Sequence, residues 1–127
     1  AHVVFEAGYG YSSIVLGHWV RDEGVLTLEE AIRKLTFMQA SIYGMHDRGL
    51  LWQGMAADVV IFDLATISAD EPDEVYDLPA GMMRLRQKAN GVHYTIVNGE
   101  VLLEDGVHTG ALPGHVMRNQ AYAATPV

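Results

Sequence analysis

The sequence predicts an α+β fold, with helices in its first third and strands in most of the remainder. Two helical patterns, at residues 12–22 and from Thr27 onward, precede any clear hairpin. After residue 58 the apolar residues form short runs between turn residues, and Asn98-Gly99 divides one such run as in a β-hairpin. At 127 residues the chain has the length of one domain.

The first helix is predicted at residues 12–22. Before it, Ala1–Phe5 has the apolar composition of a buried strand's end, and residues 6–11 are predicted to form a loop. Tyr9 and Tyr11 in this loop either cover a site or lie on a plain surface. Ser12 and Ser13 offer an N-cap, and Gly24 is a plausible end of the helix.

The second helix begins with a predicted capping box at Thr27 and Glu30, in which each side chain accepts from the other residue's amide. Leu26 and Ala31 stand at the hydrophobic staple positions. One apolar stripe then follows at helical spacing: Leu28, Ala31, Ile32, Leu35, Met38 and Ile42. Around Gln39-Ala40, one continuous helix or a bent pair of helices both fit the pattern.

The segment from Gly44 to Asp63 is predicted to run from turn to strand, to turn, to strand. Gly49 and Gly54 bracket the apolar run Leu50–Trp52, which is the first expected strand, and Val59–Phe62 is an expected buried strand. A structural role is expected for the charged residues in this segment. The aspartates Asp47 and Asp58 would bond the backbone of their own turns, and Arg48 would pair with a carboxylate.

The last third is predicted to contain a hairpin from His93 to Leu103, paired with Val59–Phe62 in a mostly antiparallel sheet. Asp105-Gly106 marks a second turn. Residues 65–91 are acidic and without clear periodicity, and residues 84–88 fit either an edge strand or one helical turn. Residues 119–127 have no pattern and are predicted to be a frayed tail.

Residues Gly54 to Asp63 resemble the pattern G-x-x-A-D-[LV]-V-x-[FL]-D of metal-dependent amidohydrolases. Further matches are Val97-Asn98-Gly99-Glu100-Val101, Thr109-Gly110, and Pro113-Gly114 with Arg118. The subgroup that the chain resembles most is the N-acyl-D-amino-acid deacylases (D-aminoacylases). The resemblance implies the end of a TIM-like (β/α)8 barrel at 1–48, the C-terminal strands of a small flanking β-domain at 49–118, and a tail at 119–127.

The resemblance also implies an enzyme that hydrolyses a linear amide with a divalent metal, zinc in most such enzymes. Its metal ligands would lie outside this sequence, and none is assigned to the chain. The six histidines are His2, His18, His46, His93, His108 and His115, and none has a His-x-His or His-x-x-x-His spacing. His18 is expected to pack beside Trp19, and His46 and His93 to be ordinary polar residues.

His2 is the one candidate catalytic residue. It would fall just after the last barrel strand of the family, near the mouth of the barrel, where such enzymes hold substrate. An ordinary loop histidine is the alternative.

Composition limits the classes of partner that this chain is expected to bind. The net charge of −8 argues against nucleic acid, and no apolar run approaches the ~20 residues of a membrane span. Without cysteine there is no disulfide framework and no thiolate metal site. The resemblance further implies a protein that acts on a small N-acyl amino acid or similar amide and contacts an N-terminal barrel segment. We expect it to be cytoplasmic, with a homo-oligomer as a further possibility. As part of such an enzyme, the 127-residue segment alone is expected to be inactive. The competing hypothesis is a self-standing α+β binding or assembly module without catalysis.

Overall fold

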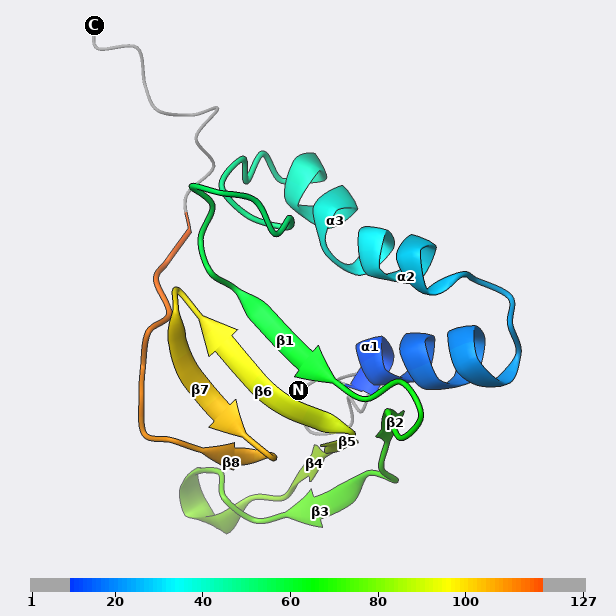
Figure 1. Ribbon diagram of the computed structural model, residues 1–127. Coiled ribbons are helices and arrows are strands. Elements are labelled where there is room, and N and C mark those ends of the chain that lie inside the picture. Colours follow the sequence, from blue (N-terminus) through cyan, green and yellow to red (C-terminus); the bar gives the residue numbers. More distant parts are fainter. Residues whose placement is uncertain (1–9, 118–127) are drawn as a thin grey trace, which may run out of the picture.

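The computed structural model describes residues 10–117, in which the helices precede the strands (Figure 1). This is the predicted mixture of helix and strand. The strand expected at 1–5, most of the loop expected at 6–11, His2 and the tail at 119–127 all lie outside the described residues. Between residues 10 and 117, no helix has the length and apolar character needed to cross a membrane.

The first helical stretch consists of α1 (Tyr11–Ile14) and the π-helical η3 (Val15–Asp22). It matches the helix predicted at 12–22, and Gly24 follows it in the left-handed conformation at φ +61°. The predicted serine cap is wrong. Gly10 is the N-cap, no side chain caps the helix, and Ser13 is buried inside it. The start is held instead by a tertiary contact, because the Gly10 amide donates to Oε1 of Gln87 at 3.0 Å.

The second helix carries the predicted capping box. Oγ1 of Thr27 accepts from the Glu30 amide at 3.2 Å, and Oε2 of Glu30 accepts from the Thr27 amide at 3.3 Å. Of the two shapes that the sequence left open, the structure has the bent pair, α2 (Leu28–Leu35) and α3 (Phe37–Ile42).

The bend lies at Thr36, a few residues before Gln39-Ala40. Thr36 has φ −122° and ψ −88°, and its hydroxyl donates to the Ile32 carbonyl at 2.7 Å. Such back-bonding by threonine often bends helices. Because α3 starts anew after the bend, Ile42 leaves the predicted stripe and is 68% exposed.

Residues 43–58 form a loop that closes on itself, with the Ala56 amide donating to the Asp47 carbonyl at 2.9 Å. The strand predicted at Leu50–Trp52 is wrong, since the run has no strand structure and Leu51 is 81% exposed. A strand needs a neighbour to pair with, and the described residues provide none for this run.

The main sheet is antiparallel with strand order β1-β6-β7-β8 (Figure 1). Its strands are β1 (Val59–Phe62), β6 (Val92–Val97), β7 (Glu100–Glu104) and β8 (Val107–His108). The predicted hairpin and its pairing with β1 are therefore confirmed, with Val59 opposite Ile96. Asn98 and Gly99 both have positive φ, which is the geometry of a two-residue hairpin turn.

The strand β1 was predicted to be buried, and this is wrong. Within residues 10–117 it is an edge strand with a partner on one side only, and Val60 is 55% exposed. The described residues cover only part of its faces.

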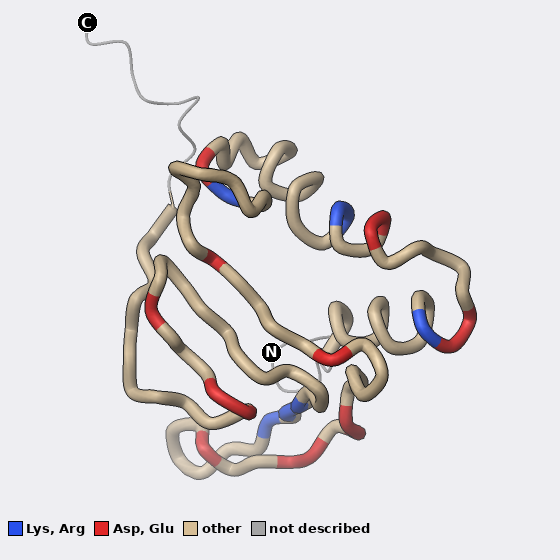
Figure 2. Tube along the Cα trace, in the orientation of Figure 1, with Lys and Arg blue, Asp and Glu red and all other residues tan. Residues whose placement is uncertain are grey.

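Two small ribbons connect β1 to β6. The first pairs β2 (Ser68–Ala69) with β5 (Ala89–Asn90), and the second pairs β3 (Asp73–Val75) with β4 (Arg84–Arg86), with the short helix η4 (Pro79–Gly81) at its tip. Of the two alternatives for residues 84–88, the structure has the strand. Acidic positions follow the β3 side and basic positions the β4 side (Figure 2). Asp73 pairs with Arg86, and Asp77 with Arg84.

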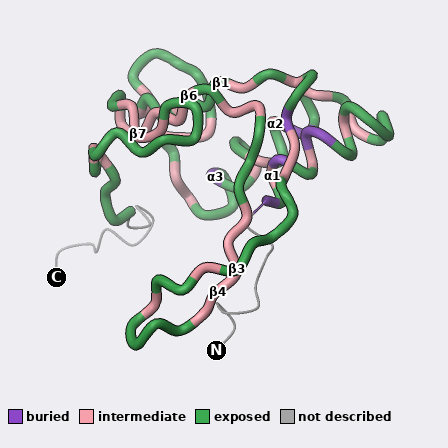
Figure 3. Tube along the Cα trace, turned by 90° about the horizontal axis from the view of Figure 1, so that it is seen from below, coloured by how far each residue is buried: buried purple, intermediate pink, exposed green. Residues whose placement is uncertain are grey.

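The core lies where η3, α2 and the segment after β1 meet (Figure 3). Leu16, Ala31 and Ile67 are its buried centre, and Leu26 packs against it as the staple predicts. Large apolar side chains stay exposed elsewhere: Phe37, Ile42, Tyr43, Leu50, Leu51, Trp52, Val60 and Ile61 are among them. Exposed apolar surface of this kind marks contact sites for further protein.

Candidate functional site

Arg48, Asp58 and Asn98 form one hydrogen-bonded unit. Arg48 pairs with Asp58 through Nη1 and donates from Nη2 to Oδ1 of Asn98 at 3.1 Å. The Asn98 amide donates to Oδ1 of Asp58 at 2.8 Å, and its side-chain amide donates to the Pro113 carbonyl at 2.7 Å. The unit therefore joins the loop after α3, the start of β1, the β6–β7 turn and the segment after β8.

The expected pairing of Arg48 with a carboxylate is confirmed. The expectation that Asp47 and Asp58 bond their own turns is wrong. Oδ1 of Asp47 is buried without a hydrogen-bond partner, 3.8 Å from Nε of Arg48. Both carboxylate oxygens of Asp58 accept from residues outside its turn, Oδ1 from the Asn98 amide and Oδ2 from Arg48. A hydrogen bond between an aspartate side chain and the backbone of its own turn occurs at Asp63, whose Oδ1 accepts from the Ala65 amide at 2.8 Å. The contacts of Arg48 and Asp58 therefore join segments of the fold.

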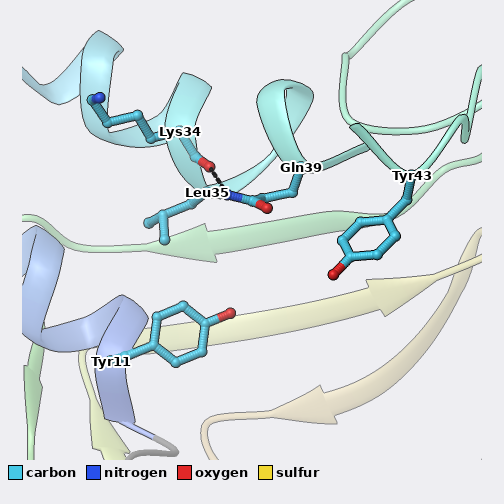
Figure 4. Close-up of a pocket in the computed structure, with 5 residues that line it drawn as sticks. All are labelled: Tyr11, Lys34, Leu35, Gln39 and Tyr43. Atoms are coloured by element: carbon cyan, nitrogen blue, oxygen red, sulfur yellow. Dashed lines mark hydrogen bonds between the residues drawn. The ribbon is translucent and has the colours of Figure 1, made fainter. Parts of the chain in front are cut away.

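An open hollow of about 420 Å³ lies between α1 and the α2–α3 pair, lined by Tyr11, Lys34, Leu35, Gln39 and Tyr43 (Figure 4). The two phenol hydroxyls point into it, whereas the Lys34 amine points away. Gln39 donates through Nε2 to the Lys34 carbonyl at 3.3 Å. The hollow offers apolar contact and hydrogen bonds but no acid–base pair. Tyr11, expected in a loop, instead opens α1 and lines this hollow.

A second open hollow, about 350 Å³, is lined by Asp70, Glu71, Asp73 and Lys88 at the base of the β3–β4 ribbon. The hydrogen bond from Arg86 holds the pKa of Asp73 below its ordinary value, and the one from Arg84 does the same for the pKa of Asp77. Both carboxylates are therefore committed to ion pairs that stiffen the ribbon.

The described histidines are scattered and do not converge. His18 is exposed, with its ring centre 4.6 Å from that of Trp19, so the expected contact is present on the surface. His46 and His93 are exposed, and Nδ1 of His93 lies 3.0 Å from Oδ1 of Asp105. Among residues 10–117 there is no group of three or more metal-ligating side chains. Residues 10–117 therefore do not by themselves bring together the three protein ligands of a catalytic metal.

Two joints were not anticipated from the sequence. Arg21 donates from Nη1 to the Ile67 carbonyl at 2.7 Å, next to Gly17, and Gln87 holds the Gly10 amide. Each of these hydrogen bonds joins residues far apart in the chain, and neither leaves a local sequence pattern from which it could be predicted.

Comparison with known proteins decides the family. The model of the Amidohydrolase family matches residues 3–103. This chain belongs to the amidohydrolase family. The match includes every residue of the Arg48–Asp58–Asn98 unit. Asp58 and Asn98 also belong to the motifs that predicted the family, so those motifs contain residues that join segments of the fold.

Within this amidohydrolase family the chain is similar to deacylases of D-amino acids. It is 35% identical over 107 residues to a D-aminoacylase and 38% identical over 110 residues to an N-acyl-D-aspartate deacylase, both from Alcaligenes xylosoxydans xylosoxydans. These matches cover 84% and 86% of this chain but 20% of each relative. The chain thus spans about a fifth of the length of the curated relatives it matches.

Solved structures agree with this placement. A crystal structure of D-aminoacylase matches with a TM-score of 0.62 at 35% identity, over 79% of this chain and 19% of that one. N-acyl-D-glutamate deacylase from Bordetella bronchiseptica, solved with zinc and a phosphonate inhibitor, matches with a TM-score of 0.55 at 31% identity, over 71% and 17% of the two chains.

Proposed function

We propose that this chain is the C-terminal part of a metal-dependent hydrolase that removes the acyl group from N-acyl-D-amino acids. The observation that carries the proposal is the 33–38% identity to three deacylases of D-amino acids, each matched over most of this chain. The substrate would be a small N-acyl amino acid. Its amide carbon–nitrogen bond is the bond broken, and water adds to the carbonyl carbon.

The metal, zinc by preference, would be held by residues outside this chain. The zinc in the structure of the Bordetella relative supports the choice of metal. When bound, such a metal polarises the substrate carbonyl and lowers the pKa of its water. The contribution of this chain would be structural, apart from His2 at the mouth of the barrel.

The same proposal divides the chain by role. Residues 1–48 would be the last part of the catalytic barrel, and residues 49–118 a C-terminal β-rich domain. The helices up to Ile42 and the strands from Val59 support this division. The exposed apolar side chains of α3 and the loop Leu50–Trp52 would pack on the N-terminal barrel segment. The outer edge of β1, which pairs with no strand of residues 10–117, would face the same segment. The protein would be cytoplasmic, with a homo-oligomer as its further assembly.

The test is hydrolysis by the full-length protein encoded by the source gene. We expect release of free D-amino acid from N-acetyl-D-amino acids, a much slower reaction with the L-isomers, and loss of activity on chelation that added zinc restores. N-acetyl-D-amino acids with an acidic, a neutral and an apolar side chain should be compared to identify the preferred substrate. A full-length protein without turnover on any N-acyl amino acid, with zinc present, would refute the proposal.

A further inference from the structure

The chain contains two Asn-Gly sequences, Asn90-Gly91 and Asn98-Gly99. Asparagine is a thermolabile residue, and a following glycine makes its spontaneous deamidation easier. The reason is that glycine has no Cβ to hinder attack by its backbone nitrogen on the side-chain carbonyl carbon of the asparagine. The same local sequence predicts the same chemistry at both positions, but the fold surrounds the two asparagines differently.

At Asn98, every group that takes part in the reaction is held by a hydrogen bond. Oδ1 of Asn98 accepts from Nη2 of Arg48 at 3.1 Å, and Nδ2 donates to the Pro113 carbonyl at 2.7 Å. The attacking nitrogen, that of Gly99, donates its proton to the Ala57 carbonyl at 2.9 Å. Asn98 is also half-buried. Deamidation at this position requires these hydrogen bonds to open together.

At Asn90, the same groups are less restrained. The residue is exposed at the end of β5, and its Nδ2 donates to Oδ1 of Asp70 and, at 3.4 Å, to Oγ of Ser68. Within residues 10–117, Oδ1 of Asn90 accepts no hydrogen bond and the Gly91 amide donates none. Gly91 has φ +71°, and a Cβ on it would lie 2.7 Å from the Ile67 amide nitrogen. The packing that requires glycine here therefore also preserves the reactive sequence.

We propose that Asn90 is a site of spontaneous deamidation and that the fold protects Asn98 from the same reaction. The Gly91 nitrogen attacks Cγ of Asn90, a carbon–nitrogen bond forms, and Nδ2 leaves as ammonia, which gives a cyclic succinimide. Water then adds to either carbonyl carbon of the ring and yields aspartate or isoaspartate. Each conversion consumes a water molecule and releases an ammonia molecule, without oxidation or reduction.

The product of this reaction disturbs the pairing of β2 with β5. A carboxylate takes the place of the amide that donates to Asp70, so that two negative charges face each other at hydrogen-bond distance and repel. Isoaspartate also adds a methylene group to the main chain opposite Ser68. The effect extends to the start of α1, because the Asp70 carbonyl accepts from Gln87 and Gln87 accepts from the Gly10 amide.

The test follows both asparagines by peptide mass spectrometry in the full-length protein, incubated at mildly alkaline pH. Fragment spectra assign the mass shift of deamidation to Asn90 or to Asn98. We expect Asn90 to convert about tenfold faster than Asn98, because more hydrogen bonds must open at Asn98. In urea that unfolds the protein, the two rates should become similar. Equal rates in the folded protein, or a difference that persists in urea, would overturn the proposal.

Two variants of the full-length protein test the effect on the β2–β5 pairing. Asn90→Ala removes the side-chain hydrogen bonds without adding charge, whereas Asn90→Asp has the side chain of the aspartate product. We expect Asn90→Asp to unfold at a lower urea concentration than Asn90→Ala, and the difference to shrink at high salt, which screens charge repulsion. Equal midpoints would overturn the repulsion between residue 90 and Asp70. Neither measurement depends on deacylase activity.

Discussion

Substitution of Gly17 by alanine tests the way η3 packs on the segment after β1. A Cβ at Gly17 would lie 2.4 Å from the Ile67 carbonyl oxygen, and this neighbour is backbone. The oxygen also accepts from Nη1 of Arg21 at 2.7 Å, so that moving the helix outward weakens this bond. Ile67 is 1% exposed and belongs to the buried centre of the core, which leaves it little freedom to move.

The magnitude follows from opposing effects. Overpacking costs about 1–3 kcal/mol, with a backbone clash at the upper end, and the weakened bond of Arg21 adds to this cost. Alanine regains about 1 kcal/mol as the better helix former. We therefore expect the free energy of unfolding to fall by about 3 kcal/mol in Gly17→Ala.

The assay is urea denaturation of the 127-residue chain followed by far-UV circular dichroism. Gly114→Ala is the matched control, because no atom lies within 4 Å of its added Cβ, and its midpoint should stay close to that of the parent. If Gly17→Ala unfolds at the same urea concentration as the parent, or at a higher one, the close packing of η3 on Ile67 is refuted.

Substitutions at four further positions and one acid titration give further tests. Thr27→Ala should lower the free energy of unfolding by roughly 1 kcal/mol and Glu30→Ala by less, and an unchanged urea midpoint in Thr27→Ala would contradict the helix start. Arg48→Met should lower the free energy of unfolding by about 2 kcal/mol, because Asp58 and Asn98 lose a charged partner. Arg48→Lys should restore only part of this loss. Equal stability of the parent and Arg48→Met would count against a stabilising role of the Arg48–Asp58–Asn98 unit. His2→Ala should lower kcat in the full-length enzyme, and a parental rate would return His2 to an ordinary loop position. The lowered pKa values of Asp73 and Asp77 stabilise the fold above their unfolded pKa of about 4, and this contribution is lost as pH falls through the lower folded values. Acid unfolding followed by circular dichroism should therefore be less steep in a variant with both residues changed to asparagine, and an identical curve would argue against the two ion pairs.

Local patterns predicted those parts of the fold that local interactions determine. The capping box at Thr27 and the turn at Asn98-Gly99 satisfy backbone groups within a few residues, so their sequence signatures are sufficient. The strand predicted at Leu50–Trp52 failed because a strand depends on a partner that periodicity does not reveal. The N-cap of the first helix was predicted wrongly for a similar reason, since Gly10 is held by a residue distant in the chain.

The candidate site likewise combines features that the sequence predicts with contacts that it does not reveal. The resemblance of Gly54–Asp63 to amidohydrolases identified the family, but it pointed to residues that join segments of the fold, as the Arg48–Asp58–Asn98 unit shows. Gln87 carries no motif. Its hydrogen bonds to Gly10 and Asp70 join segments far apart in the chain, and the sequence alone does not reveal them.

The most direct test of the account measures whether the chain needs the N-terminal barrel segment. The 127-residue chain and the upstream segment of the same gene should be expressed separately and then combined. Light scattering, zinc analysis and release of D-amino acid from an N-acetyl-D-amino acid are recorded for each part and for the mixture. The account predicts a self-associating chain without stoichiometric zinc or turnover, and a mixture that gains all three properties of the enzyme: a defined mass, bound zinc and deacylase activity. A monodisperse monomer of the chain alone that carries stoichiometric zinc or hydrolyses the substrate would contradict it.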